Sequence, residues 1–261
     1  MIFIRPNAKN RVYLDPQGPR YISNTINSQR AAPGTIKIVT FNIKFSRRIN
    51  EALLLLQKPP LQNVDILCLQ EMDLKGVSRL AEGLHCNFVY YPALFHPWLK
   101  QDFGNAILCP WPIVKESKIV LPYSDSSRFP RIAVKVILTL GEIRVAVFCT
   151  HTKVFLSPRQ RGTPVEEILK YVPDDTKHCI VAGDFNTFTR ADCEAVISPM
   201  KEAGFDYVSK DAGFSYTYWY LFNKKAALDH IFVKGMKKVT AGVVLDKSAS
   251  DHFPVWAEAE I

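Results

Sequence analysis

The feature that most constrains this chain is a short apolar run ending in two polar residues, His178-Cys-Ile-Val-Ala-Gly-Asp-Phe-Asn186. Residues 179–182 predict a buried strand, and Gly183 lets the backbone turn closely at its end. Side chains alternate along a strand, so Asp184 and Asn186 are expected on one face. Such a carboxylate and amide suit a metal ion, a water or a phosphate oxygen. An Asx-turn that closes the strand is an equally good interpretation of these residues alone.

The same pattern recurs along the chain, because several other predicted strands also begin or end in polar residues. Residues 35–41 alternate like a strand, and residues 64–71 and 143–149 are apolar runs of strand length. The polar residues at strand ends are Asn42, Glu71, His151, Asp184 with Asn186, Asp229, and Asp251 with His252. Any one of them can be a turn residue or a satisfied core group. Their repetition favours a hydrolytic site assembled from strand ends.

Helical patterns separate these strands. Apolar residues recur at helical spacing in 49–57, 77–83, 157–172 and 189–204, and the last of these is expected to be interrupted near Pro199. Strands alternate with helices in both halves of the chain. This order predicts an α/β fold in which two sheets pack face to face with helices outside.

Residues 1–34 differ from the rest of the chain. They contain four prolines, two glycines, five basic residues and one acidic residue, without sustained periodicity. We predict an irregular basic N-terminal arm over 1–34 and a catalytic domain over 35–261. The whole chain has a net charge of +8, which favours polyanionic partners such as nucleic acid or an anionic membrane surface.

Several classes of protein are disfavoured by composition. No apolar run approaches the roughly 18 residues of a membrane span. The N-terminus lacks the pattern of a signal peptide, so a cytoplasmic protein is expected, although a secreted chain whose signal had been removed would look the same. The six cysteines form no CxxC pair, and most lie in apolar runs. Buried free thiols are therefore favoured over disulfides or a zinc site.

Six short motifs occur in a fixed order: Thr40-Phe-Asn-Ile43, Leu69-Gln-Glu71, Thr150-His151, Gly183-Asp-Phe-Asn186, Leu228-Asp229 and Ser250-Asp-His252. The ordered set resembles the endonuclease/exonuclease/phosphatase superfamily, which includes exonuclease III, neutral sphingomyelinases and inositol phosphatases. The resemblance covers residues 35–261. It implies a deoxyribonuclease-I-like four-layer α/β sandwich, with two packed mixed β-sheets flanked by helices.

Phosphodiester hydrolysis needs a cation near the phosphoryl oxygens, an activated water and an acid for the leaving oxygen. Oxygen ligands without thiolates favour Mg²⁺ or Mn²⁺ over zinc. The resemblance implies that Glu71 is the main metal ligand, with Asn42 and Asp251 beside it.

The remaining motif residues have expected catalytic roles. Asp229 shares a strand face with Ile231, so its carboxylate should be buried and in need of a partner, for which His252 is the natural candidate. The resemblance implies such an Asp–His pair. It also implies that Asp184 orients or deprotonates the attacking water or protonates the leaving group, that Asn186 donates to the phosphate, and that His151 stabilises developing charge.

Three further polar residues lie in these strands. Asn105 and Arg131 are candidate substrate-binding residues, because relatives often carry polar or basic groups there, and a structural role is the equal alternative. His230 lies on the opposite strand face from Asp229 and is expected to be a packing or hydrogen-bonding histidine.

Two hypotheses about the substrate class remain, a nucleic acid and a lipid or inositol phosphoester. A nuclease acting on DNA or RNA is favoured by the basic charge and by Tyr216-Thr-Tyr-Trp219, which resembles a segment of exonuclease III relatives. The alternative is a sphingomyelinase-like or other lipid or inositol phosphoesterase at a membrane surface, for which 95–99 and 219–222 supply apolar loops. An inactive relative is disfavoured because the catalytic motifs are intact. The sequence indicates no protein partner, and a monomer is expected.

Overall fold

The computed structural model describes residues 11–26, 33–124, 129–218 and 224–261. In this part of the chain the strands form two large mixed sheets and one small two-stranded sheet. The first sheet has eight strands in the order β1-β5-β6-β4-β3-β16-β15, with β2 also paired to β5. The second has six strands in the order β11-β14-β10-β9-β8-β7. The expected pair of mixed sheets is confirmed.

The strands of the first sheet are β1 (Arg11–Val12), β2 (Tyr21–Ser23), β3 (Thr35–Asn42), β4 (Ile66–Met72), β5 (Asn87–His96), β6 (Gln101–Cys109), β15 (Lys237–Val243) and β16 (Val255–Glu260). The strands of the second sheet are β7 (Ile113–Val120), β8 (Ile132–Leu140), β9 (Ile143–His151), β10 (His178–Asp184), β11 (Asp206–Tyr207) and β14 (Asp229–Lys234). The small sheet is formed by β12 (Tyr216–Tyr218) and β13 (Lys224–Ala226).

The two large sheets pack face to face around the largest apolar cluster. Ile38 and Ile66 contribute from the first sheet, and Val147 and Ile180 contribute from the second. All four are fully buried. Every second side chain of these strands therefore points into the inter-sheet core, and the intervening side chains face the helices outside.

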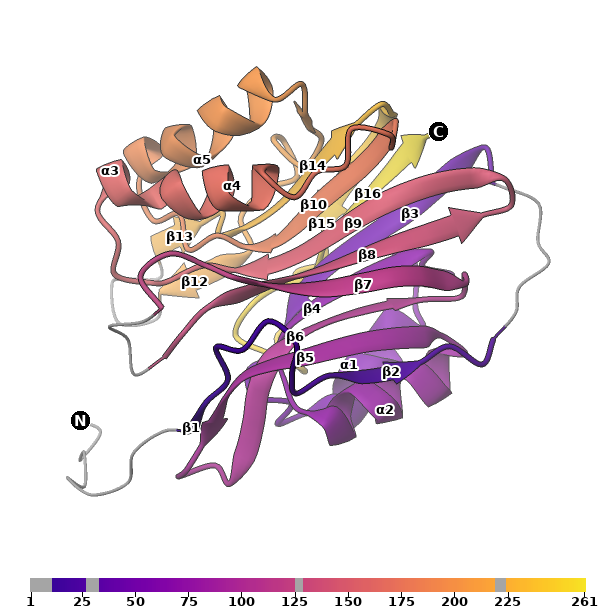
Figure 1. The fold of residues 1–261 in the computed structure, drawn as a ribbon, viewed down its shortest axis with the longest axis vertical. Helices are drawn as coiled ribbons and strands as arrows, with labels where there is room; N and C mark the ends of the chain where they lie inside the picture. Colours follow the sequence, from indigo (N-terminus) through magenta and orange to yellow (C-terminus); the bar gives the residue numbers. More distant parts are fainter. Residues whose placement is uncertain (1–10, 27–32, 125–128, 219–223) are drawn as a thin grey trace.

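Helices cover the outer face of each sheet. These helices are α1 (Ile49–Leu56), α2 (Leu74–Leu84), α3 (Pro158–Arg161), α4 (Thr163–Leu169) and α5 (Arg190–Glu202). Residues of α1 and α2 form one apolar cluster with the first sheet, and residues of α4 and α5 form another with the second. Figure 1 shows the two helix groups on opposite sides of the paired sheets. The result is the four-layer sandwich of deoxyribonuclease-I-like structures.

The helix around Pro199 differs from the expectation. Residues 190–202 form one continuous helix, α5, and Pro199 lies inside it. Thr189 and Asp192 start the helix with a reciprocal capping box. Proline removes one backbone N–H donor without ending the helix here, since the apolar face on either side, through Val196 and Met200, stays packed on the second sheet.

The described part of residues 1–34 packs on the first sheet through β1 and β2, which both pair with β5. A buried lysine of the second sheet also holds this segment, because Lys118 Nζ donates to the carbonyl oxygens of Tyr13 at 3.0 Å and Gly18 at 2.6 Å. Burial lowers the pKa of Lys118 to about 8. Among the described residues, no helix is long and apolar enough to cross a membrane.

Candidate active site

The candidate site lies where five strands meet at one end of the sandwich. Strands β3 and β4 run parallel, as do β9 and β10, so their carboxyl ends deliver polar residues to the same edge of each sheet. Strand β14 runs antiparallel to β10 and begins at this edge. The register places His151, Asp184 and Asp229 side by side on three adjacent strands.

Glycine at position 183 is required by the close approach of β10 to β9. A Cβ atom on Gly183 would lie 2.0 Å from the carbonyl oxygen of Thr150. Any larger residue would separate the two strands just before Asp184. The glycine thus fixes the distance between the carboxylate and His151.

The two carboxylate oxygens of Asp184 do different things. Oδ1 accepts from the backbone N–H of Asn186 at 2.9 Å, which is the Asx-turn that the sequence allows. Oδ2 accepts from Asn42 Nδ2 at 3.0 Å and lies 3.4 Å from His151 Nε2 and 3.8 Å from His252 Nε2. The turn and the site are therefore built from the same side chain.

Asp229 and His252 form the expected pair. His252 Nδ1 lies 2.8 Å from Asp229 Oδ2, and both side chains are buried. Ser215 Oγ accepts from the backbone N–H of Asp229 and holds the start of β14. A carboxylate can only accept, so Nδ1 carries the proton and Nε2 faces Asp184.

Of the two histidines beside Asp184, one is neutral and the other is positively charged near neutral pH. Burial lowers the pKa of His151 well below its usual value, and the nearby Arg131 adds to this effect. Burial also lowers the pKa of His252, but the negative charges of Asp229 and Asp184 outweigh it and raise the pKa to about 10. Near neutral pH, Asp184 therefore lies between a neutral imidazole and an imidazolium.

The protonation of Asp184 changes near neutral pH. Burial raises its pKa to about 7, and Asp229 adds to the increase, while His252 and the hydrogen bond from Asn42 oppose it. A group with this pKa both accepts and releases a proton near pH 7. Either of the two proton-transfer roles expected for Asp184 is thus chemically accessible.

The three residues predicted to surround the metal are linked to this carboxylate through Asn42. Asn42 Nδ2 contacts Glu71 Oε1 at 3.3 Å as well as Asp184. Burial raises the pKa of Glu71, which Arg131 and His252 counteract. Asp251 is close enough to raise the pKa of Glu71 further. The chemistry fits a hard divalent cation, because the side chains offer carboxylate and amide oxygens and no thiolate.

A second compact set of acidic and imidazole atoms overlaps this group. Asp184, Asp229 and His252 each place one ligand atom within 4.8 Å of the others. Asp229 Oδ1 is buried and has no hydrogen-bond partner among the described residues. These atoms lie close enough together to hold a metal ion, and two of the residues, His252 and Asp229, already share a hydrogen bond.

Lys44 is a site residue that the motifs did not identify. Its Nζ lies 2.8 Å from Asp251 Oδ2, and its backbone has a φ of 44°. The left-handed turn over residues 44–46 carries the side chain back toward the site instead of along the strand. The only signal in the sequence was the basic residue two positions after Asn42.

Arg131 precedes β8 and Asn105 contacts the first residue of that strand, but the two side chains differ in their partners. Arg131 is close enough to Glu71 and Asp184 for both to raise its pKa, and burial lowers that pKa overall. Its Nη1 is buried without a hydrogen-bond partner among the described residues. Asn105 Nδ2 donates to the carbonyl oxygen of Ile132 at 2.8 Å and joins the two sheets. The substrate-binding role of both residues stays a prediction.

Asn186 and the loop after β9 are held by backbone contacts. Asn186 Nδ2 donates to the carbonyl oxygen of Thr152 at 3.0 Å, and Arg131 Nε donates to the same oxygen at 3.4 Å. Arg161 is buried and donates to the carbonyl oxygens of Lys153, Val154, Leu156 and Phe185. The contact of Asn186 with a substrate phosphate stays a prediction.

His230 packs on the far side of β14, as expected from its strand face. Thr187 Oγ1 and Tyr207 Oη lie 2.6 Å from Nε2 and Nδ1 respectively. Burial lowers its pKa to about 4. This histidine belongs to the core of the second sheet and takes no part in the site.

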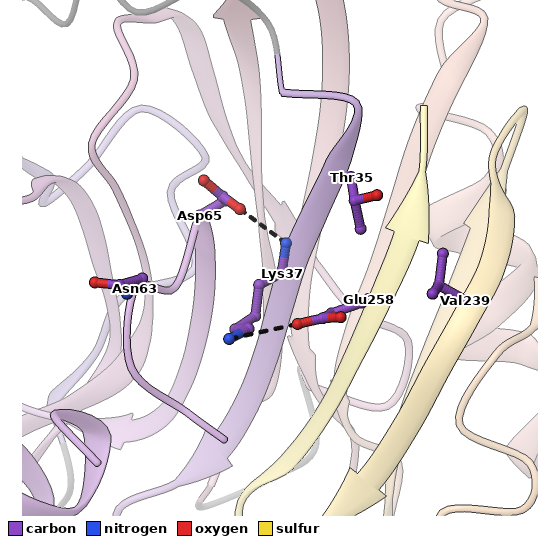
Figure 2. Close-up of a pocket in the computed structure, with 6 residues that line it drawn as sticks. All are labelled: Thr35, Lys37, Asn63, Asp65, Val239 and Glu258. Carbon is purple, nitrogen blue, oxygen red and sulfur yellow. Dashed lines mark hydrogen bonds and ion pairs between the residues drawn. The ribbon is translucent and has the colours of Figure 1, made fainter. Parts of the chain in front are cut away.

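A polar depression lies at the opposite end of β3 from Asn42. Thr35, Lys37, Asp65 and Glu258 are among the residues that line it (Figure 2). Lys37 satisfies both acids, through its Nζ to Glu258 at 3.4 Å and through its backbone N–H to Asp65 at 2.8 Å. These charged groups are paired with each other, and no lining residue belongs to the six motifs.

The sequence matches the model of the Endonuclease/Exonuclease/phosphatase family over residues 39–252. This chain belongs to the endonuclease/exonuclease/phosphatase family. It is a phosphoesterase of that family, and the matched residues include every predicted catalytic and metal-site residue. A comparison with curated proteins gives no match.

Solved structures with this family fold are similar over most of the chain. A family protein from Beutenbergia cavernae has a TM-score of 0.70 at 17% identity, covering 88% of this chain and 72% of that one. D. rerio TDP2, solved with a single-strand DNA product, has a TM-score of 0.70 at 16% identity, covering 88% and 100%. A mannosyl-6-phosphatase from Bacteroides thetaiotaomicron has a TM-score of 0.68 at 17% identity, covering 87% and 100%. At these identities the similarity establishes the fold.

Proposed function

We propose that this protein is a divalent-metal-dependent phosphodiesterase acting on nucleic acid. The observation that carries the proposal is the position of Asp184 Oδ2, between the neutral His151 at 3.4 Å and the charged His252 at 3.8 Å. The buried carboxylate of Asp184 thus has a pKa of about 7, which suits proton transfer, and the imidazolium of His252 lies beside it. Phosphodiester hydrolysis needs both at one place.

The side chains divide the chemistry. Asp229 holds the Nδ1–H of His252 and helps to keep the ring charged, so Nε2, which lies beside Asp184, also carries a proton and stabilises negative charge on the phosphoryl group. Asp184 takes a proton from the attacking water or gives one to the leaving oxygen. Arg131 supplies a guanidinium whose Nη1 is free of other partners among the described residues.

The metal would be held by Glu71, with Asn42 and Asp251 beside it, and Mg²⁺ or Mn²⁺ fits these oxygen donors. When bound, the cation would neutralise negative charge that builds up on the phosphoryl oxygens. Magnesium keeps several waters, so one or two protein carboxylates are sufficient.

Nucleic acid is favoured over other phosphoesters by two observations. The net charge is +8, and the relative TDP2 was solved with a single-strand DNA product. The membrane alternative relied on two apolar loops. Residues 95 and 96 of the first loop end strand β5, and residues 219–222 of the second lie outside the described residues. A lipid or inositol phosphoester is therefore the second candidate.

The mechanism is tested by replacing the two proton-handling residues. We expect Asp184→Ala and His252→Ala to lower kcat/KM on bis(p-nitrophenyl) phosphate by about 10² or more, because each removes a group that acts in the transition state. Activity should disappear in chelator and return with Mg²⁺ or Mn²⁺. Full hydrolysis in chelator, or by Asp184→Ala, would reject the mechanism.

The substrate class needs a panel under one metal condition. Plasmid, single-stranded and duplex oligonucleotides, sphingomyelin vesicles and inositol phosphates should be compared with the same enzyme. We expect turnover of the nucleic acids. Turnover of vesicles alone would replace the nuclease proposal by the membrane alternative.

A further inference from the structure

A continuous series of rings leads away from the site on the side of His151. Phe103 lies 5.9 Å from His151 and 5.4 Å from Phe45, measured between ring centroids. Phe45 is followed by His96 at 5.7 Å, and His96 contacts both Trp98 at 5.9 Å and Phe129 at 5.8 Å. We call these five residues, Phe45, His96, Trp98, Phe103 and Phe129, the aromatic ridge.

The ridge has a buried base and an exposed end. Phe103 and His96 are buried, whereas Trp98 is 45% and Phe129 is 41% exposed. Trp98 lies in the turn between β5 and β6, which projects beyond the rest of the first sheet in Figure 1. The buried His96 contacts both exposed rings, so the solvent-exposed surface of Trp98 is held in place for a ligand.

Cationic groups alternate with these rings. The guanidinium of Arg47 lies over Phe45 at 5.5 Å, and that of Arg131 lies over Phe103 at 5.1 Å. Lys100, two residues after Trp98, is exposed. Rings interleaved with cations beside a phosphate site match a nucleic-acid strand, whose bases stack on the rings while its phosphates face the cations.

A second series of rings and cations leaves the site on the side of His252. The ring of Tyr216 lies 4.8 Å from that of His252. Nearby, Lys225 lies over Phe214 at 4.4 Å, and Lys247 lies over Phe253 at 5.6 Å. Asp184 lies between His151 and His252, so rings and cations flank it on both sides. This arrangement suits a polymer that crosses the site.

We propose that the aromatic ridge binds unpaired bases of a single-stranded nucleic acid whose phosphodiester lies beside Asp184. Bases within a duplex stack on one another and do not offer their faces to an exposed ring such as that of Trp98. Two exposed rings are enough to stack one or two bases, but they are a small apolar area for binding a membrane. The inference rests on the proposed phosphodiesterase function and names its substrate class.

The test compares Trp98→Ala and Phe129→Ala with Tyr171→Ala. Tyr171 is an equally exposed aromatic residue, at 42%. It comes before His178, where β10 begins, whereas Asp184 is at the other end of that strand. For each variant, kcat/KM is measured on a short single-stranded oligonucleotide of mixed sequence and on bis(p-nitrophenyl) phosphate. We expect the ratio of the two values to fall about tenfold in each ridge variant and to be unchanged in Tyr171→Ala.

Binding provides a readout that does not depend on turnover. The anisotropy of the labelled oligonucleotide, measured in chelator, should give a Kd about tenfold higher for each ridge variant, with a smaller effect on the matching duplex. Trp98→Phe should retain most of the affinity, because it keeps a stacking face.

Three results would overturn the inference: an unchanged ratio and Kd in both ridge variants, an equal loss of single-strand and duplex binding, or a loss confined to hydrolysis of sphingomyelin vesicles. The first two leave the phosphodiesterase proposal standing. Wild-type protein that does not hydrolyse bis(p-nitrophenyl) phosphate with Mg²⁺ or Mn²⁺ would reject the phosphodiesterase proposal, and the inference with it.

Discussion

At the scale of single residues, His230 shows how a buried side chain couples stability to pH. Thr187 Oγ1 donates to the carbonyl oxygen of Ala227 at 2.7 Å, so it accepts from His230 Nε2. Tyr207 Oη then donates to Nδ1. Both ring nitrogens are satisfied in the neutral form, and burial lowers the pKa to about 4.

The folded protein should therefore lose stability from this residue as the pH falls. Below a pH of about 6.5 the unfolded chain takes up a proton on His230, whereas the folded chain does so only near pH 4. The contribution is fully present above pH 6.5 and decreases by about 3 kcal/mol by pH 4.

Urea unfolding at several pH values between 4 and 7 measures this effect, with wild type compared to His230→Gln. The difference in unfolding free energy between the two proteins should shrink as the pH falls. A difference that is constant over this range would contradict the assignment of a neutral His230. Other histidines with lowered pKa values act in both proteins and cancel in the comparison.

The residue scale also shows why Asp184 and Asn186 were ambiguous in sequence. The structure contains the Asx-turn and leaves the second oxygen for other partners, since one carboxylate oxygen closes the turn and the other faces Asn42 and two histidines. A local pattern predicts the turn because its partner is two residues away. The histidines come from elsewhere in the chain, and only the ordered motifs pointed to them.

At the scale of elements, α3 supplies the side chain that holds the loop after β9. Arg161 is 1% exposed and donates to four backbone carbonyl oxygens, and its Nε lies 3.5 Å from Asp192. One of these carbonyls is that of Phe185, between Asp184 and Asn186. The short helix thus holds both the loop and the turn that carries the Asp184 carboxylate.

We expect Arg161→Ala to destabilise the fold by about 3 kcal/mol or more, because it removes a donor from several buried carbonyl oxygens and the cation beside Asp192. Arg159→Ala is the matched control, since Arg159 is in the same helix and exposed. Thermal unfolding should separate the two variants clearly. Equal melting temperatures for Arg161→Ala and wild type would mean that the loop is held by other contacts.

The main elements were predictable because their patterns are local. Strands at 35–41, 64–71 and 143–149 and the helix at 49–57 correspond to β3, β4, β9 and α1. The stretch 157–172 proved to be two short helices that meet at Gly162. Strands β1 and β2 carry almost no pattern of their own, since their pairing with β5 depends on a partner more than sixty residues away.

At the scale of the whole molecule, the net charge of +8 should govern how tightly substrate binds. Binding of single-stranded nucleic acid releases counterions, so affinity falls as salt rises. For about two or three phosphate contacts, the Kd should rise roughly tenfold between about 50 and 200 mM salt.

Anisotropy titrations at several salt concentrations measure this slope. Hydrolysis of bis(p-nitrophenyl) phosphate, which carries a single charge, serves as the comparison and should depend only weakly on salt. An oligonucleotide affinity that does not change with salt would contradict a role for the basic groups in substrate binding.

The sequence by itself determined the α/β class, the strand ends that carry polar residues, and the family to which the chain belongs. These features depend on the periodicity of neighbouring residues and on the order of short motifs along the chain, and both are visible without the tertiary structure. It also predicted the pairing of Asp229 with His252, because a buried carboxylate needs a partner.

Tertiary structure alone decided what the site residues do for one another. Sheet register placed Asp184 beside His151 and Asp229, and Asp229 in turn holds His252. Burial with unequal neighbours then made one histidine neutral and the other charged. It also brought Lys44 to Asp251 and placed rings from three separate segments next to one another in the aromatic ridge. The physical reason is that pKa values and contacts depend on distances across the two sheets, and these exist only once the sheets are packed.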